Sequence, residues 1–169
     1  RQIALNAVWG SGPSDVWAVG TRGTILHGDG GAFVPVASST DTYFAVWGTA
    51  KDDVWTVNAT APLHSSGFQG GAATFTPRVG STWSASGATS GRIWTGHSTS
   101  PTDVWLAGDL SSRFGPSSSF WWLDAGAADG GDAGMAWTGT TACPVGQYCT
   151  SSLRSVWASD AEHVWAVGP

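Results

Sequence analysis

Two short apolar runs separated by a polar turn recur four times along the chain. In the first copy, residues 6–20, the runs are Ala7-Val8-Trp9 and Val16-Trp17-Ala18-Val19, with Gly, Ser, Pro and Asp between them. Valine and tryptophan suit a pleated, half-buried surface, and such a turn between two such runs predicts a β-hairpin. The later copies read FAVWGTAKDDVWTVN (44–58), RIWTGHSTSPTDVWLAG (92–108) and RSVWASDAEHVWAVG (154–168). One repeated β unit is therefore expected to build the whole chain.

The first two copies extend into four strands each. The predicted strands are 5–9, 15–19, 23–27 and 32–36, then 43–47, 53–57, 62–64 and 73–79. Trp47 follows Trp9 by 38 residues, and Trp55 follows Trp17 by the same 38. Pro35 has no N–H to give to a ladder, so the fourth strand is predicted to lie at the sheet edge.

The later copies are less regular. The third unit is predicted to have strands at 93–94, 103–107, 119–123 and 135–138, with a long Gly/Ala/Asp-rich loop at 125–134. Its longer spacing is read as insertions in loops. Trp94 is thereby placed at the repeat position of Trp9 and Trp47. The fourth unit supplies only two strands before the sequence ends.

Four-stranded antiparallel units of about 40 residues with a Trp signature are typical of a β-propeller. We therefore predict an all-β propeller of about three and a half blades, with the V-W-G strands innermost. The divisions are blade 1 (3–38), blade 2 (42–79), a connector (80–90), blade 3 with long loops (91–142), a Cys loop (143–152) and half of blade 4 (153–169). Such an array should expose two apolar faces. We expect further blades of a longer chain, or a second copy, to cover them.

The repeat also resembles a known group of proteins. The pattern V-W-G, then D-V-W-A-V-G-x-x-G-T-I-L-H-x-D-G, resembles propeller repeats of bacterial extracellular proteins and is similar to those of tectonin-type lectins. It is distantly similar to the BNR repeats of sialidase-type propellers, although the Asp-box S-x-D-x-G-x-x-W is not matched. Residues 28–33 occupy the comparable turn without its serine. The resemblance implies a fold and carries no functional residue.

Composition narrows the possible partners. Only 11% of residues are charged and the net charge is -5, which disfavours a nucleic acid or an anionic membrane surface. No apolar run approaches the roughly 18 residues of a membrane span. The 24 glycines, 12 tryptophans and single glutamate argue against helices.

Most tryptophans are predicted to be structural because they recur at two positions of the repeat. These eight are Trp9, Trp17, Trp47, Trp55, Trp94, Trp105, Trp157 and Trp165. Trp137 aligns with Phe33 and Phe75 and is assigned to packing as well. Trp83 lies in the connector, and Trp122 occupies the position of His27 and His64. Together with Trp121 these two are the predicted ligand-binding residues, by stacking on a sugar; covering a blade face is the alternative.

No catalytic or metal-binding constellation emerges. His27, His64, His97 and His163 have no partner at metal-ligand spacing, and each is expected to satisfy a turn hydrogen bond. Asp15, Asp53 and Asp103 directly precede Val-Trp and are expected to accept hydrogen bonds from turn N–H groups. No carboxylate pair, nucleophile motif or phosphate loop is found.

These observations favour a non-enzymatic binding or scaffold module of a secreted or cell-surface protein, with carbohydrate as the expected ligand class and no cofactor. The alternative is a structural or adhesive module that binds other protein chains. A third reading is a propeller hydrolase whose catalytic residues lie outside this sequence. Fold alone separates none of these.

The two cysteines give the first testable prediction. Cys143 and Cys149 enclose a short Pro- and Gly-containing segment, and we expect a disulfide that reports an oxidising compartment. Thiol titration of the denatured, unreduced protein should find no free thiol. Two titratable thiols would remove the main argument for secretion.

Overall fold

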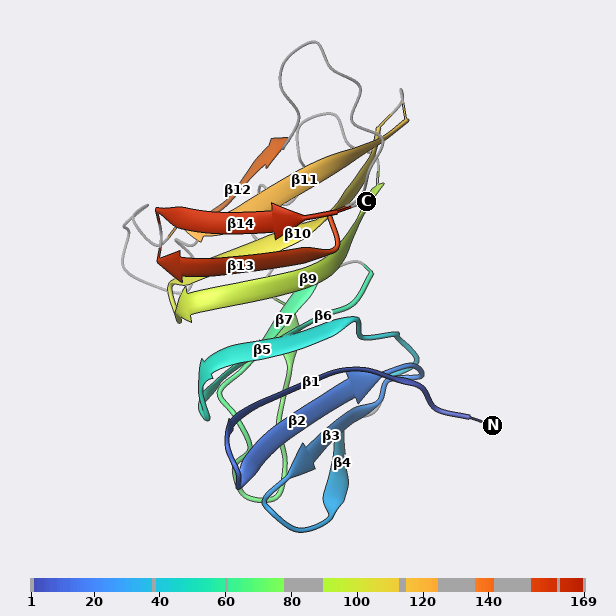
Figure 1. Cartoon of the computed structure of the whole chain (residues 1–169). Helices are drawn as coiled ribbons and strands as arrows, with labels where there is room; N and C mark the ends of the chain where they lie inside the picture. The colour runs from blue at the N-terminus through green and yellow to red at the C-terminus, as the bar shows by residue number, and fades with distance from the viewer. Residues whose placement is uncertain are drawn as a thin grey trace. The chain divides into compact units, whose positions relative to one another are not determined.

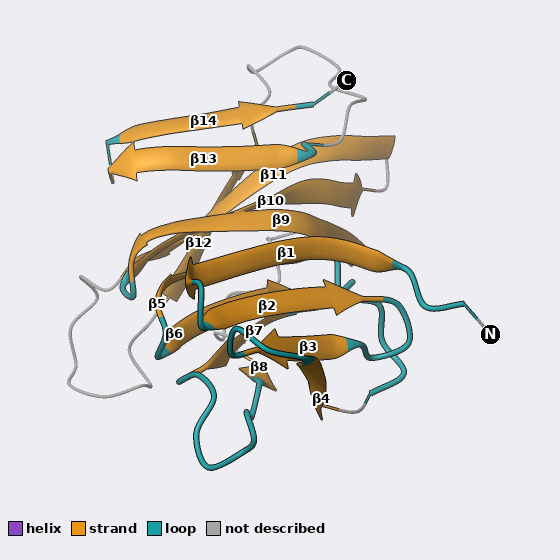
Figure 2. Cartoon of the chain, turned by 60° about the horizontal axis from the view of Figure 1, so that its bottom comes forward, coloured by secondary structure: helices purple, strands orange, loops and turns teal. Residues whose placement is uncertain are grey.

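The computed structural model describes residues 2–37, 39–59, 61–77, 90–112, 115–124, 136–141, 153–160 and 162–168. Residues 37, 90, 91, 109–112, 115–124 and 136–141 are described by their backbone alone. The described residues form four antiparallel sheets and contain no helix (Figures 1 and 2). The all-β prediction is confirmed. The chain divides into two compact units, residues 1–78 and 79–169, each described by itself below.

The first unit contains two four-stranded meanders. The strands are β1 (Leu5–Gly12), β2 (Asp15–Gly20), β3 (Ile25–Gly28), β4 (Phe33–Ala37), β5 (Ala45–Ala50), β6 (Asp53–Val57), β7 (Pro62–Ser65) and β8 (Thr76–Pro77). Their orders are β1-β2-β3-β4 in the first sheet and β5-β6-β7-β8 in the second. The prediction that the Pro35 strand lies at an edge is confirmed, because β4 ends its sheet. The strand predicted at 73–79 is only the short β8.

The second unit contains one four-stranded and one two-stranded sheet. The strands are β9 (Ser90–Ser100), β10 (Asp103–Ser112), β11 (Gly115–Asp124), β12 (Ala136–Thr141), β13 (Ser155–Asp160) and β14 (His163–Val167). The third sheet has the order β12-β11-β10-β9, and β13 pairs with β14 in the fourth. The strands predicted at 93–94, 103–107 and 119–123 are all longer than expected. Met135, the predicted start of the last strand of the third sheet, lies outside the described residues.

One predicted repeat position is wrong. Trp9 pairs with Trp17, Trp47 with Trp55 and Trp157 with Trp165, as the alignment predicts. In the third sheet, however, Trp105 pairs with His97. The turn between β9 and β10 holds only Pro101 and Thr102, like the two-residue turns of the first two sheets. The extra residues therefore lengthen β9 and place Trp94 three positions earlier along the strand, so His97 takes the repeat position.

A β-bulge recurs next to each of these turns. The pairing register shifts between Gly10 and Gly12 in the first hairpin, and at the corresponding point in the other three. The residues that the register skips are Ser11, Thr49, Thr99 and Ser159. A bulge bends its strand and redirects the extra side chain. Here that side chain always carries a hydroxyl group.

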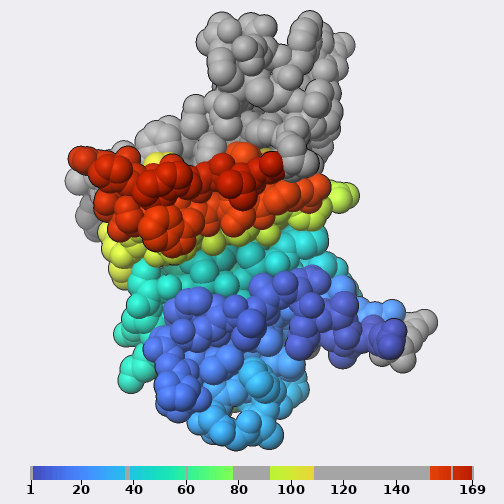
Figure 3. Space-filling view, viewed as in Figure 1, coloured from blue at the N-terminus to red at the C-terminus, as the bar shows by residue number. Residues whose placement is uncertain are grey.

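The two sheets of the first unit, blue and cyan in Figure 3, pack directly on each other. The core of the unit lies between them. We call the side of each sheet that bears the second Trp of the repeat its back face, and the opposite side its front face. Back-face residues Trp17, Val19 and Ile25 of the first sheet pack against front-face residues of the second. These are Tyr43, Val46, Val54 and Leu63. Because the apolar side chains alternate along each strand, both faces of a sheet are available for packing.

The second unit repeats this arrangement. Trp105 and Ala107 on the back face of the third sheet pack with Val156 and Val164 on the front face of the fourth. The backbone contact between the sheets recurs too: Tyr43 N donates to Gly20 O at 3.0 Å, and Leu153 N donates to the equivalent Gly108 O at 3.3 Å.

Within each unit the sheets approach most closely at their first strands. Strand β1 lies along β5 in the first unit, and β9 lies along β13 in the second (Figure 1). The chain segment before β1 crosses directly beside Gly20, where an added Cβ would meet the carbonyl oxygen of Ala4 at 2.0 Å. Gly20 is therefore required for this close crossing.

Substituting Gly20 tests that requirement. Gly20→Ala should lower the free energy of unfolding by about 1–3 kcal/mol, because the methyl group forces the Ala4 segment away from the sheet. Gly12→Ala is the matched control, since nothing lies within 4 Å of its added Cβ. The control should change stability by no more than about 1 kcal/mol. Urea unfolding measures both; equal effects would contradict the assigned role of Gly20.

Candidate binding pocket

A carboxylate organises the first hairpin. Ser11 Oγ donates to Asp15 Oδ2 at 2.5 Å, and Trp17 Nε1 donates to Asp15 Oδ1 at 3.0 Å. His27 Nε2, from the neighbouring strand β3, lies 2.9 Å from the same Oδ1. Asp15 thus joins the bulge, the second strand and the third strand through one side chain. We call this arrangement the carboxylate hub.

The hub recurs in the second sheet. Thr49 Oγ1 donates to Asp53 Oδ2 at 2.5 Å, Trp55 Nε1 donates to Oδ1 at 2.9 Å, and His64 Nε2 lies 2.9 Å from Oδ1. In the third sheet Thr99 Oγ1 donates to Asp103 Oδ2. We expected turn N–H groups to donate to these aspartates, but the donors are side chains.

In the fourth sheet, where His163 stands in place of this aspartate, Asp160 accepts from turn N–H groups. Its Oδ1 accepts the N–H of Glu162 at 3.0 Å and that of His163 at 2.8 Å. The side-chain donors of the other hubs are therefore partly replaced by the backbone.

The hubs keep their carboxylates ionised. Burial by itself raises the pKa of Asp53, but hydrogen bonds from His64, Thr49 and Trp55 outweigh it and leave the pKa below its ordinary value of 3.8. The pKa of Asp15 is lowered for the same reason: the penalty of burial is exceeded by the hydrogen bonds from Ser11, His27 and Trp17. These groups are therefore structural anions at neutral pH.

His27 contacts two aromatic rings. Its ring centroid lies 4.6 Å from that of Trp17 and 4.3 Å from that of Phe68, with Phe68 stacked at 23°. The hydrogen-bond partner of His27 is the Asp15 carboxylate, whereas the sequence predicted a hydrogen bond to a turn. The described residues contain no group of three or more His, Cys, Asp or Glu side chains that could hold a metal ion.

An open polar pocket lies over the first hub. It encloses about 690 Å³ between the β1–β2 turn, the β5–β6 turn, the β3–β4 turn and the segment after β7. Its lining residues are Ser11, Gly12, Ser14, Asp15, His27, Asp29, Lys51, Asp52, Ser66, Phe68 and Gln69. The buried His27 and half-buried Asp15 line its inner part, and exposed residues such as Asp29, Asp52 and Gln69 line its rim.

Glycine places the loop that carries Phe68 and Gln69. Gly67 has φ +87°, and an added Cβ would meet the Lys51 carbonyl oxygen at 2.1 Å, so the loop can approach the β5–β6 turn only with glycine here. Beyond it, Gln69 and Ala72 exchange backbone hydrogen bonds at 2.8 and 3.1 Å. Gly70 and Gly71 both have positive φ, as a tight type I′ turn requires.

The pocket offers hydrogen-bonding groups of every kind. Hydroxyl groups come from Ser14 and Ser66, an acceptor from Asp52, an ammonium group from Lys51 and an amide from Gln69. The carboxylate of Asp15 is already engaged by three side chains and belongs to the frame. Such a site suits a polar, multiply hydroxylated ligand better than an apolar one.

The predicted ligand-binding tryptophans are only partly placed. Trp122 pairs with Trp105 in β11–β10 register, as His27 pairs with Trp17 and His64 with Trp55, so its predicted repeat position is confirmed. The side chains of Trp121, Trp122 and Trp137 lie outside the described residues. Trp83, Cys143 and Cys149 lie outside them entirely. Ligand binding by Trp83, Trp121 and Trp122 stays a prediction.

Two tryptophans assigned to the core are not buried. Trp157 and Trp165 are each 52% exposed, whereas Trp17, at the position of Trp165, is fully buried. Both lie on the back face of the fourth sheet, whose front face packs on the third. Recurrence in the repeat predicts where a tryptophan points, and burial depends on a following sheet.

The sequence contains a signal for the hub. A Ser or Thr stands four residues before each of Asp15, Asp53 and Asp103, and His27 and His64 recur opposite the tryptophans. The pocket residues Phe68 and Gln69 carry no such signal, because the sequence of their loop, residues 66–72, does not recur in the other repeats.

Comparison with protein-family models, with curated proteins and with solved structures gives no match for this chain. The described residues include no helix that is long and apolar enough to cross a membrane.

Removing the charge from a hub gives a pH-dependent prediction. Asp53→Asn should lower the free energy of unfolding at pH 7 by about 1.5–3 kcal/mol, the range for hydrogen bonds to charged groups. Because the folded-state pKa of Asp53 is lowered, its stabilisation is complete above the ordinary value of 3.8 and is lost as the pH falls below it. The difference between wild type and variant should therefore shrink from pH 5 to pH 3.

The exposed neighbour Asp52→Asn is the control and should change stability by at most about 0.5 kcal/mol. Denaturant unfolding across this pH range measures all three proteins. A pH-independent difference between wild type and Asp53→Asn would contradict the role of the carboxylate charge.

Proposed function

We propose that this chain is a non-enzymatic carbohydrate-binding module of a secreted or cell-surface protein, built from β-propeller blades. The observation that carries the proposal is the polar pocket of about 690 Å³ over the first carboxylate hub. It combines a hydrogen-bonded inner part with exposed hydrogen-bonding groups on its rim. Small-molecule sites have this form: a concave surface with a few fixed polar groups.

The propeller architecture is proposed from three features of the sheets. Each complete sheet is a four-stranded antiparallel meander, and the hairpin with its bulge recurs in all four sheets. The front face of one sheet packs on the back face of the sheet before it in both units. The first strands lie closest together, as strands near a propeller axis do.

A sugar is the ligand that the rim favours. Hydroxyl groups act as donors and acceptors at once, so they match a rim that holds the Asp52 carboxylate, the Lys51 ammonium and the Gln69 amide. Phe68 is half-buried, so part of its ring remains available for an apolar contact beside them.

The hub argues for binding rather than catalysis. Both oxygens of Asp15 are engaged by Ser11, Trp17 and His27, and its pKa is lowered, which suits neither a general acid nor a free base. The same arrangement in the second sheet, around Asp53, supports a structural role.

A second candidate function is assembly with other protein chains. The observation that favours it is a pair of exposed apolar sheet faces, one bearing Val8 and the other bearing Trp157 and Trp165. Isolated surface hydrophobics are ordinary, but contiguous ones mark interaction sites.

A glycan array on the intact chain tests the carbohydrate proposal. The glycan that binds best is then titrated against Asp52→Ala/Gln69→Ala, which removes two exposed rim groups. We expect at least about a tenfold loss of affinity. Glu162→Ala, an exposed acid in the other unit, is the control and should bind like wild type.

Two other outcomes are informative. A loss confined to Trp122→Ala would move the ligand from this pocket to the tryptophans of the third sheet. Binding of no glycan by a normally folded chain would count against the carbohydrate proposal as a whole.

A further inference from the structure

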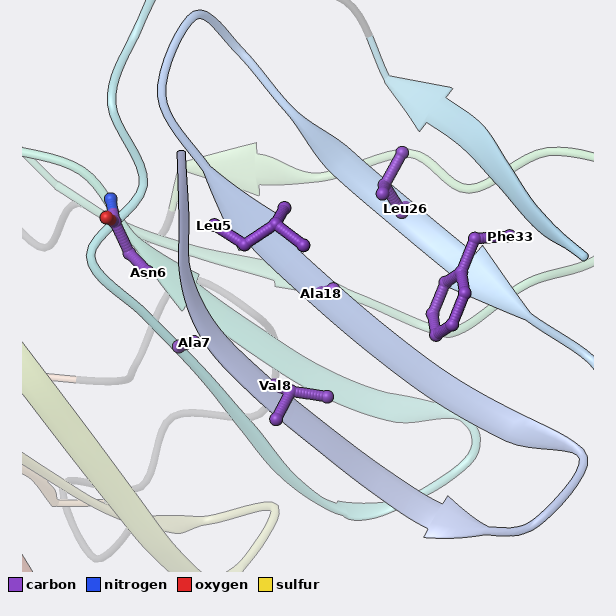
Figure 4. A pocket seen from close by; sticks show the side chains of 7 residues that line it. All are labelled: Leu5, Asn6, Ala7, Val8, Ala18, Leu26 and Phe33. Carbon is purple, nitrogen blue, oxygen red and sulfur yellow. The ribbon is translucent and has the colours of Figure 1, made fainter. Parts of the chain in front are cut away.

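The first sheet leaves its front face uncovered. Val8 is 69% exposed and Leu5 is 55% exposed, although their repeat equivalents Val46 and Tyr43 are only 6% and 4% exposed in the second sheet. Leu5, Val8, Leu26 and Phe33 lie on one side of the sheet, around a hollow of about 400 Å³ (Figure 4). The residues are thus of the type that the repeat buries, at positions that the repeat buries.

The fourth sheet leaves its back face uncovered. Trp165 is 52% and Val167 61% exposed, whereas their equivalents Trp17 and Val19 are fully buried in the first unit. Trp157 lies beside Trp165, with ring centroids 5.1 Å apart. An aromatic pair of this size is a strong hydrophobic surface.

The two exposed faces are complementary. In the first unit a back face with Trp17 and Val19 meets a front face with Tyr43, Val46 and Leu63. The exposed back face of the fourth sheet carries a Trp and a Val, like the back face of the first sheet. The exposed front face of the first sheet carries Val8 and Leu26, which correspond to Val46 and Leu63 on the front face of the second. The chain therefore contains both halves of a contact that it already makes twice.

Details of the existing contacts extend to the exposed faces. The ring of Trp9 lies so close to Gly48 that an added Cβ would meet it at 2.8 Å. Gly10 is the equivalent of Gly48, and Trp157 that of Trp9, so a Trp157 ring finds a glycine at the same place. Trp17 also packs edge-on against Phe75, with centroids 5.7 Å apart at 82°, as Trp165 would against Phe33.

We propose that the uncovered front face of the first sheet binds the uncovered back face of the fourth sheet in a second copy of this chain. In this contact Trp165 and Val167 cover Val8 and Leu26, and Trp157 lies over Gly10. The Leu5 N–H donates to the Gly168 carbonyl, as Tyr43 donates to Gly20 and Leu153 to Gly108. A second copy of the chain presents such a back face, with the two tryptophans and the Gly168 carbonyl together.

Such a contact is heterologous, because each copy presents one face and receives the other. Copies joined in this way form either a closed ring or an open chain of molecules. The inference rests on the assembly candidate above and is independent of the carbohydrate pocket, whose residues lie on neither face.

Two complementary variants test the contact. Val8→Asp places a charge on the front face, and Trp165→Ser removes the main ring from the back face. Both residues are exposed, so each variant should keep the circular dichroism and melting temperature of the wild type. Val34→Asp is the control, because Val34 is 44% exposed on the edge strand and lies on neither of the two faces of the proposed contact.

Light scattering over a range of protein concentrations reads the result. Wild type and Val34→Asp should associate as concentration rises, while Val8→Asp and Trp165→Ser should each stay monomeric. A mixture of the last two should form a one-to-one dimer and nothing larger, because one intact face remains on each. This rescue by mixing distinguishes a lost contact from a misfolded chain.

Other outcomes overturn the proposal. A wild type that stays monomeric at every concentration would refute both the second copy and this basis for the assembly candidate. If Val8→Asp still associates when it is not mixed with the other variant, the interface lies elsewhere. The same holds if the mixture of the two variants stays monomeric while wild type associates. Neither result would bear on glycan binding, which is measured separately.

Discussion

Each sheet of this chain is apolar on both faces, and this single constraint governs the rest of the molecule. A sheet with valines on one side and tryptophans on the other is stable only between two neighbours. Val46 on the second sheet and Trp17 on the first are buried by meeting each other. A sheet that lacks one of these neighbours keeps one apolar face exposed. The exposed Val8 and Trp165 are therefore products of the same rule that buries their equivalents.

The carboxylate hub makes such a sheet possible near its turns. Buried polar atoms are costly unless they are hydrogen-bonded, and Asp15 accepts from the buried Trp17 indole N–H and lies within hydrogen-bond distance of the buried His27 imidazole. It also accepts from the exposed hydroxyl of the bulge residue Ser11. The indole can therefore be buried without leaving its N–H unsatisfied. The bulge has a purpose in this scheme, since it turns Ser11 or Thr49 towards the carboxylate.

Hairpin patterning was enough to predict the strands, because alternation and turn chemistry are local properties. The edge position of the Pro35 strand followed from its missing N–H in the same way. The predicted repeat position of Trp94 was wrong because sequence spacing cannot distinguish a longer strand from a longer loop. The predicted burial of Trp157 and Trp165 was wrong because burial depends on a neighbouring sheet. The pocket was not predictable, since its walls come from turns far apart in sequence.

The hydrogen bonds of the hubs come from other residues, so the two residues at each hairpin tip supply none of them. They read Pro13-Ser14 in the first sheet, Lys51-Asp52 in the second and Pro101-Thr102 in the third. Charge, stiffness and hydrogen-bonding character thus differ from tip to tip on one unchanged frame. A lineage of such chains could therefore vary the contacts of the proposed binding pocket at these tips alone, while the aspartate, indole and hydroxyl of the hub stay fixed.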